Sequence, residues 1–143
     1  MSVVATQAET QTFRANAAEI GDMDRWVEHI GTRWGIPELA LFRARICLTE
    51  VAANVLEHGG TIRGGNDQIV ITLRNRAPAV EIEFIDAGMA FNPIDAPSPA
   101  AAAPSKRGTD RGRGLILLHS YASQMKYRRE RDQNILQFRV SAA

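Results

Sequence analysis

The stretch ICLTEVAANVLEHGG, residues 46–60, contains three side chains whose types and spacing could do chemistry. Glu50, Asn54 and His58 recur at four-residue steps, so an α-helix would place all three along one stripe. Most neighbouring residues are small or apolar, and an unpaired carboxylate in such surroundings costs several kcal/mol unless it is neutralised. The stripe is therefore either an exposed polar face with caps and salt bridges or the wall of a polar pocket.

Each member of the stripe suits a different chemical task. Glu50 could act as a base or as a metal ligand, and Asn54 offers a neutral oxygen of the kind that Mg²⁺ prefers. His58 would lie at the C-terminal end of the helix, where a cationic side chain is favoured. The three histidines, His29, His58 and His119, are widely separated along the chain, which gives a zinc site little support.

A second cluster follows an apolar strand pattern in FIDAGMAFNP, residues 84–93. Asp86 stands where that strand ends, so its carboxylate could accept hydrogen bonds from an amino group or from the edge of a base. Gly88 has no side chain and would let a ligand approach the backbone closely. Asp-x-Gly is also a common turn sequence, so an ordinary turn is the alternative at this point.

A third cluster lies in RGTDRGRGLILLHS, residues 107–120, where glycines precede an apolar helix pattern. Backbone N–H groups at the start of such a helix could hold phosphate oxygens. Arg111 and Arg113 add positive charge beside Gly112 and Gly114. The spacing matches neither the dinucleotide-binding fingerprint nor the Walker phosphate loop.

The composition is that of one globular domain, residues 1–143, with 45% hydrophobic and 23% charged residues. The formal net charge of +1 favours neither nucleic acid nor a membrane surface, and the basic run at 126–131 is interpreted as a solvated face. The single cysteine, Cys47, excludes an internal disulfide, and its apolar helical surroundings predict a core residue. We find no signal peptide pattern and no apolar run of membrane length, so we expect a cytoplasmic protein.

The elements that must position these clusters follow from hydrophobic periodicity. Apolar spacing predicts one helix from a cap at Asn16 to about Gly35 and a second helix over 38–58. Alternating residues predict an antiparallel hairpin over 69–86 and a last hairpin that turns through DQN, residues 132–134. The remaining predicted elements are a first strand at 8–15 and a helix that begins in GRGL. Helices would cover one face of a mixed, mostly antiparallel sheet, which is a two-layer α/β sandwich.

The order of three motifs along the chain is more specific than any one of them. E-x-x-x-N-x-x-x-H-G at 50–59, D-x-G-x-x-F-x-P at 86–93 and G-R-G-L-x-L at 112–117 together resemble the GHKL superfamily of ATPases and kinases. Within it they are similar to the anti-sigma-factor serine/threonine protein kinases of bacterial sporulation and stress responses. The resemblance covers almost the whole chain and implies the Bergerat ATP-binding fold, with residues 92–111 as the nucleotide lid.

By this resemblance the cofactors are ATP and Mg²⁺. Asn54 would coordinate Mg²⁺, and Asp86 would accept a hydrogen bond from the adenine amino group. Glu50 would be the catalytic residue that receives the proton of the attacking serine hydroxyl. The other nucleotide-binding residues that the matched motifs imply are His58, Gly88, Phe91, Arg111, Gly112, Arg113, Gly114 and Leu115. The final hairpin of the wider superfamily often carries a threonine near the adenine, whereas RDQNILQF in this chain contains none.

The resemblance also implies partners. The expected function is an anti-sigma factor that phosphorylates a STAS-domain antagonist and exchanges it for a sigma factor in a partner-switching pathway. A homodimer is expected, with the first strand and helix as a candidate surface, and direct binding of nucleic acid is not. One alternative is a nucleotide-dependent binding module without kinase activity, against which Glu50 argues. Another is the ATP-binding domain of a histidine kinase, but the chain is too short for the phosphoacceptor helices.

Overall fold

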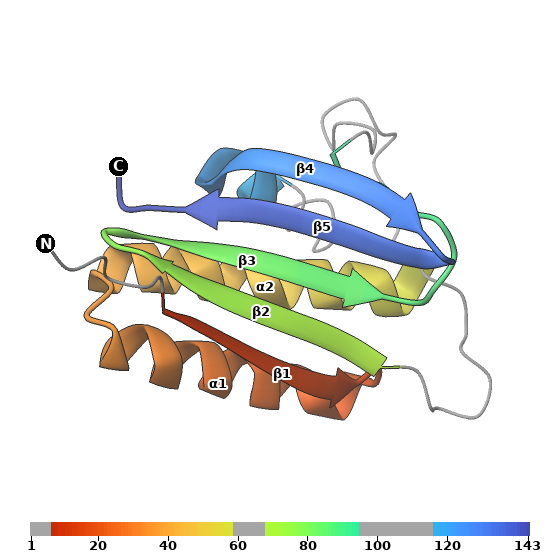
Figure 1. Ribbon diagram of the computed structural model, residues 1–143, viewed down its shortest axis with the longest axis horizontal. Coiled ribbons are helices and arrows are strands. Elements are labelled where there is room, and N and C mark those ends of the chain that lie inside the picture. Colours follow the sequence, from red (N-terminus) through yellow and green to blue (C-terminus); the bar gives the residue numbers. More distant parts are fainter. Residues whose placement is uncertain (1–6, 59–67, 95–115) are drawn as a thin grey trace, which may run out of the picture.

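The protein is a two-layer α/β sandwich in the computed structural model, which describes residues 7–58, 68–94 and 116–143. Its elements are β1 (Ala8–Arg14), the 3₁₀ helix η1 (Ala17–Glu19), α1 (Ile20–Arg33), α2 (Glu38–His58), β2 (Gln68–Arg76), β3 (Ala79–Asp86), β4 (Ala122–Glu130) and β5 (Gln133–Val140), and residues 116–121 are also helical. The strands form one sheet in the order β1-β2-β3-β5-β4, and every pairing among these described strands is antiparallel. Helices α1 and α2 cover one face of the sheet, which confirms the predicted fold class (Figure 1).

Alternate residues of the central strands point toward the helices and form the core. In β2 these residues are Ile69, Ile71 and Leu73, which are fully buried. β3 and β5 continue the same layer with Val80, Ile82, Phe84, Leu136, Phe138 and Val140. Burying a side chain of this size contributes about 1.5–3 kcal/mol. A shift of one residue would expose the whole layer, so the core determines the register that places Asp86 opposite Asn134.

The two helices have nearly the bounds that the sequence predicts. α2 spans the predicted residues, and α1 ends at Arg33, just before Gly35 adopts a φ of +73°. That left-handed conformation ends helices readily at glycine, because no Cβ opposes it. Among the residues that the structure describes, no helix combines the length and the apolar character needed to cross a membrane.

A side-chain cap and a hydrogen bond to β1 hold the 3₁₀ helix η1, which leads directly into α1. α1 itself begins at Ile20 without a side-chain cap. Asn16 Oδ1 accepts a hydrogen bond from Glu19 N at 3.1 Å, as the predicted cap requires. The Glu19 carboxylate accepts from Arg14 N at 2.8 Å and so ties the helix start to the end of β1. The ring of Trp26 packs edge-on against Phe13, with centroids 5.7 Å apart. These contacts hold η1 and α1 against β1.

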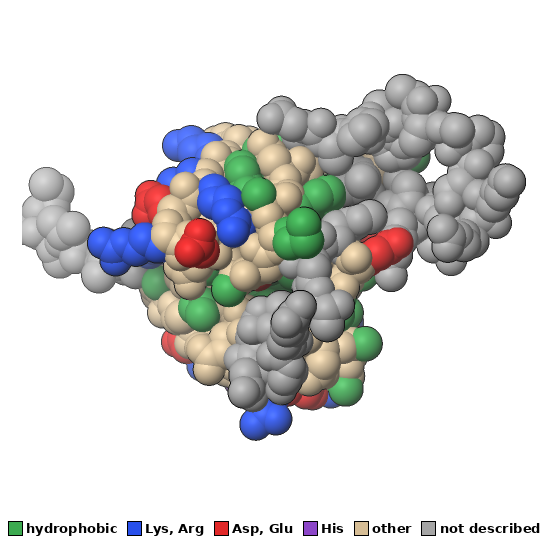
Figure 2. Space-filling model, turned by 90° about the vertical axis from the view of Figure 1, so that its right-hand side faces the viewer, with side chains coloured by type: hydrophobic (Ala, Val, Ile, Leu, Met, Phe, Trp, Pro, Cys, Tyr) green, Lys and Arg blue, Asp and Glu red, His purple; other side chains and the backbone are tan. Residues whose placement is uncertain are grey.

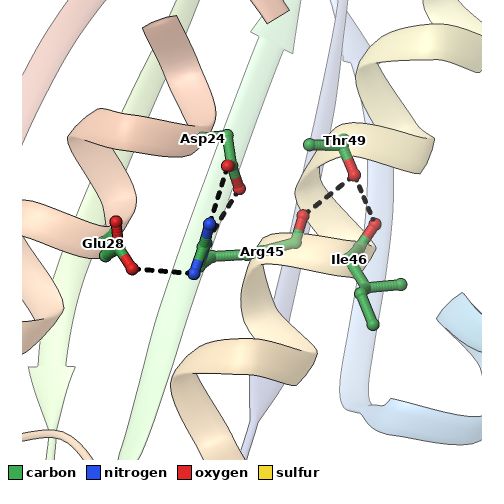
Figure 3. A network of polar contacts seen from close by, with 5 residues as sticks. All are labelled: Asp24, Glu28, Arg45, Ile46 and Thr49. Atoms are coloured by element: carbon green, nitrogen blue, oxygen red, sulfur yellow. Dashed lines mark hydrogen bonds and ion pairs between the residues drawn. The ribbon is translucent and has the colours of Figure 1, made fainter. Parts of the chain in front are cut away.

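An ion-pair network joins α1 to α2 (Figure 3). The guanidinium of Arg45 in α2 donates to both carboxylate oxygens of Asp24 and to Glu28 Oε2, each at 2.9 Å. The hydrogen bonds to Asp24 are the main reason that the pKa of Arg45 is raised. One turn later, Thr49 Oγ1 donates to the carbonyls of Arg45 and Ile46. The network helps to set the rotation of α2, which decides where its polar stripe faces.

The last hairpin turns earlier than the sequence predicts. Arg131 and Asp132 adopt φ values of 51° and 63°, the left-handed backbone of a two-residue type I′ turn. Gln133 and Asn134 therefore lie in β5, and the predicted turn at 132–134 is wrong. The prediction failed because Asp, Gln and Asn are frequent in loops, whereas the register with β3 draws Asn134 into the sheet.

Candidate functional site

The polar stripe of α2 meets the interior of the protein at Asn54. This side chain is 2% exposed, and its Nδ2 donates to Glu50 O, one turn earlier, at 2.8 Å. Asn54 Oδ1 is buried and has no hydrogen-bond partner among the described residues. A buried acceptor left unpaired costs about 1–3 kcal/mol. The stability of the fold therefore does not explain an asparagine at this position.

Glu50 and Asn54 line one cavity together with side chains from other elements. β3 contributes Asp86, and β5 contributes Asn134 directly opposite it. The other lining residues are Val51, Val55, Phe84, Phe91, Pro93, Leu118, Tyr127 and Leu136. The cavity holds about 20 Å³, which is room for about one water molecule. Polar groups that are far apart in the sequence thus converge on one small space with mostly apolar walls.

The backbone after β3 folds back onto the Asp86 carboxylate. Gly88 N donates to Asp86 Oδ1 at 2.9 Å, and Asn134 Nδ2 donates to the same oxygen at 3.0 Å. Asp86 is 4% exposed, so these donors compensate a buried carboxylate that would otherwise be costly. Figure 2 looks onto this end of the molecule, where hydrophobic and charged side chains are both exposed, and Met89 is 65% exposed.

The oxygen atoms on the cavity wall are of the kind that a hard cation prefers. Mg²⁺ takes oxygen ligands, and Asn54 Oδ1 is an oxygen on the cavity wall that no described group satisfies. Glu50 adds a carboxylate to the same wall. Within the described ranges, no group of three or more His, Cys, Asp or Glu side chains could hold a metal ion by itself. A cation here would therefore need ligands of another kind, such as phosphate oxygens and water.

The structure brings together part of the predicted site. Glu50, Asn54, Asp86 and Phe91 line the same cavity, and Gly88 contacts the Asp86 carboxylate through its backbone. His58 is the last residue of α2, and its side chain lies outside the described part of the structure. The remaining predicted residues also lie outside the described ranges: Arg111, Gly112, Arg113, Gly114, Leu115 and most of the predicted lid.

Three residues beside Asp86 were missed by the sequence prediction. Asn134 Oδ1 accepts from Tyr127 OH at 2.5 Å and from Arg129 Nη1 at 3.0 Å. Arg129 Nη1 also donates to Gly88 O at 2.9 Å, so this member of the basic run at 126–131 does more than cover a solvated face. The signal in the sequence that could have identified Tyr127 and Arg129 is strand alternation, which places their side chains on the same face of β4. In the structure this face points toward α2.

Cys47 takes no part in the cavity. It is a free, fully buried thiol on α2, as the sequence predicts. Burial raises the pKa of Cys47 to about 12, with a smaller contribution from the charge of Glu50. The thiolate is the nucleophilic form of cysteine, and at neutral pH this environment suppresses it.

Known proteins that are similar to this chain include two kinases. Serine/threonine-protein kinase BtrW of Bordetella bronchiseptica is 27% identical over 133 residues, which cover 93% of this chain and 93% of that protein. The histidine kinase domain of the blue-light activated histidine kinase EL346 from Erythrobacter litoralis gives a TM-score of 0.46 at 19% identity. The match covers 91% of this chain and 62% of that solved structure.

The sequence profile of the histidine kinase-like ATPase domain matches residues 13–140. The matched range includes the sheet from the end of β1 onward, both helices and all the residues named above as lining the cavity. Nearly the whole chain is therefore accounted for by one domain type. Together with the sheet and the cavity, this match shows that the chain belongs to the histidine kinase-like ATPase domain family.

Proposed function

We propose that this chain is an ATP-dependent serine/threonine protein kinase that acts as an anti-sigma factor. It would phosphorylate a STAS-domain antagonist in a partner-switching pathway, with a sigma factor as the second partner and a homodimer as the functional state. Family membership supports ATP binding, and the similarity to a serine/threonine-protein kinase supports phosphoryl transfer. The observation that carries the proposal is the convergence of Glu50, Asn54 and Asp86 on one cavity.

Two of these residues have proposed binding roles. Asp86 accepts a hydrogen bond from the adenine amino group, and Asn54 Oδ1, which lacks a partner among the described residues, is a ligand for Mg²⁺. When bound, Mg²⁺ and ATP supply the transferable phosphoryl group and the neutralisation of its charge. A nucleotide is far larger than a cavity of about 20 Å³, so the cavity walls have to separate when ATP binds.

Glu50 has the proposed catalytic role. Its carboxylate lines the cavity one helical turn from Asn54, where it can orient a serine hydroxyl of the protein substrate. The serine oxygen bonds to the γ-phosphorus while the bond to the β,γ-bridging oxygen breaks, which releases ADP. Glu50 takes the hydroxyl proton during this step.

Replacing Glu50 by Gln tests the proposal. Glu50→Gln keeps the size and shape of the side chain but removes the carboxylate that acts as the base. We expect transfer of label from γ-labelled ATP to a candidate antagonist to fall by about 10²–10⁴-fold, the usual contribution of a general base. ATP binding, measured by isothermal titration, should change little.

A matched control is Glu38→Gln. Glu38 is exposed in the first turn of the same helix, about 18 Å along the axis from Glu50, so transfer should be unchanged. If Glu50→Gln transfers phosphate as fast as the wild type, the role of Glu50 is wrong. If the wild type binds ATP and the antagonist but transfers nothing, the protein is a nucleotide-dependent binding module instead.

A further inference from the structure

Asn134 connects several segments of the protein at the cavity through hydrogen bonds. It lies opposite Asp86 on the neighbouring strand and is 4% exposed. Its Nδ2 donates to Asp86 Oδ1 at 3.0 Å and to Met89 O at 2.9 Å. Its Oδ1 accepts from Tyr127 OH at 2.5 Å, Arg129 Nη1 at 3.0 Å and Phe91 N at 3.3 Å. One amide thus joins β3, β4, β5 and the segment that follows β3.

These contacts determine which way the Asn134 amide points. A flipped amide would direct Nδ2 at three donors and Oδ1 at two acceptors, so only one orientation is compatible with the surroundings. In that orientation both hydrogens of Nδ2 are in use. Asn134 therefore holds other groups in place and has no further N–H to offer to a ligand.

The group that Asn134 holds most directly is the carboxylate of Asp86. Asp86 Oδ1 receives hydrogen bonds from Asn134 Nδ2 and Gly88 N, and the carbonyl of that same Gly88 is held by Arg129. Two donors on one carboxylate oxygen set the plane of the group and hence the direction of the other oxygen. The direction of that oxygen decides which donors on the edge of a base can reach the carboxylate.

We propose that Asn134 is a specificity-determining positioning residue, which orients Asp86 so that the pocket selects adenine. This inference rests on the proposed ATP site. Adenine carries an amino group at C6, which donates to a carboxylate. Hypoxanthine carries a carbonyl at C6, which would face the carboxylate as a second acceptor. A site that pairs with a donor rejects an analogue that lacks it, because its own buried polar group is then left unpaired.

Comparing ATP with inosine triphosphate tests this inference, because the two bases differ only at C6 and in the proton on N1. We expect the wild type to bind ATP at least tenfold more tightly than inosine triphosphate by isothermal titration. Asn134→Leu removes the amide but keeps a side chain of similar size. This variant should reduce the ratio of the affinity for ATP to the affinity for inosine triphosphate at least tenfold, mainly because it binds ATP more weakly.

A second variant keeps the test decisive if Asn134→Leu folds poorly. Asn134→Ala removes the amide, and with it the hydrogen bond to Asp86, without placing a bulkier or charged group against Tyr127, Arg129 and the backbone of Phe91. We expect the same loss of selectivity from this variant.

The matched control is Gln137→Leu. Gln137 Nε2 donates to Glu83 Oε2 at 3.0 Å, which is also an amide–carboxylate pair between β5 and β3. Gln137 alternates with Leu136 and Phe138 and so points to the opposite face of the sheet from the cavity. Its loss should leave the affinity ratio unchanged.

The outcomes separate this inference from the proposed function. If the wild type binds neither nucleotide, both are overturned. If the wild type prefers ATP and the folded Asn134 variants keep that preference, the role of Asn134 is wrong and the ATP site stands. A wild type that binds both nucleotides equally also overturns the inference, because Asp86 then does not distinguish an amino group from a carbonyl at C6.

Discussion

Asn54 and Asn134 face the same cavity, but their hydrogen bonding differs. Every polar group of the Asn134 amide is paired, whereas Asn54 Oδ1 has no partner among the described residues. The pairing of Asn54 Nδ2 with Glu50 O stabilises the protein by about 1 kcal/mol, while its buried Oδ1 costs about 1–3 kcal/mol. At the scale of single residues, the Asn134 amide stabilises the fold, whereas the Asn54 side chain has a net cost for the fold, which its proposed role in the ATP site explains.

Asn54→Leu is therefore expected to leave the free protein as stable as the wild type or more stable by up to about 2 kcal/mol. Leucine has a similar volume and leaves no polar atom unpaired in the core. The same variant should lose the additional rise in melting temperature that Mg²⁺ gives to the ATP complex. Urea denaturation without ligand and thermal melting with ATP, each with and without Mg²⁺, measure the two effects. A large loss of stability in the free protein would contradict this account of Asn54.

At the scale of elements, the contact between α1 and α2 determines where the polar stripe faces. The Arg45 network fixes one side of this contact (Figure 3), and close packing at Gly31 fixes another. Gly31 is buried in α1, and a Cβ at this position would collide with the side chain of Leu41 from α2. The two helices can approach so closely because glycine has no side chain there.

Gly31→Ala is expected to destabilise the protein by up to about 2 kcal/mol. Alanine favours a helix by up to about 1 kcal/mol over glycine, but forcing a methyl group into a packed contact costs about 1–3 kcal/mol. Gly21→Ala in the same helix is the matched control. A Cβ there meets only the flexible end of Arg25, at 3.4 Å, so this variant should be neutral or slightly stabilised. Urea denaturation curves that rank the two variants in the opposite order would contradict the packing argument.

At the scale of the whole molecule, one sheet and one core join both ends of the chain. β1 and β5 belong to the same sheet, and the core cluster runs from Phe13 to Val140. Both tryptophans lie near the first strand and helix: Trp26 packs on Phe13, and Trp34 packs against the core. Tryptophan fluorescence therefore reports on the N-terminal elements, and far-ultraviolet circular dichroism reports on all of them.

We expect both signals to follow one cooperative transition in urea, as small single domains do. A saturating concentration of ATP, about 100 times its dissociation constant, should move both transitions together by about 2.7 kcal/mol. If fluorescence changed at a lower urea concentration than circular dichroism, the N-terminal strand and helix would form a separate unit. The prediction of one domain over residues 1–143 would then be wrong.

Local patterns in the sequence were enough to predict the elements and some of the site. The apolar spacing before Gly35 and the cap at Asn16 predicted the helical segment formed by η1 and α1, because helix ends depend on a few neighbouring residues. The four-residue step from Glu50 to Asn54 predicted one shared face, since helical periodicity is a local property. The order of the motifs identified the family, which the match over residues 13–140 confirms.

Only the tertiary structure decided which distant groups meet. In the sequence, Asn134 resembles a turn residue. Its position opposite Asp86 depends on the register between β3 and β5, which the buried layer that includes Phe84 and Leu136 determines. Arg129 looks like part of a solvated basic run, but the position of β4 beside β5 directs it at Gly88. Helix periodicity and capping act between neighbours and can be read from the chain. Contacts across strands depend on how the core packs, and no local pattern records that.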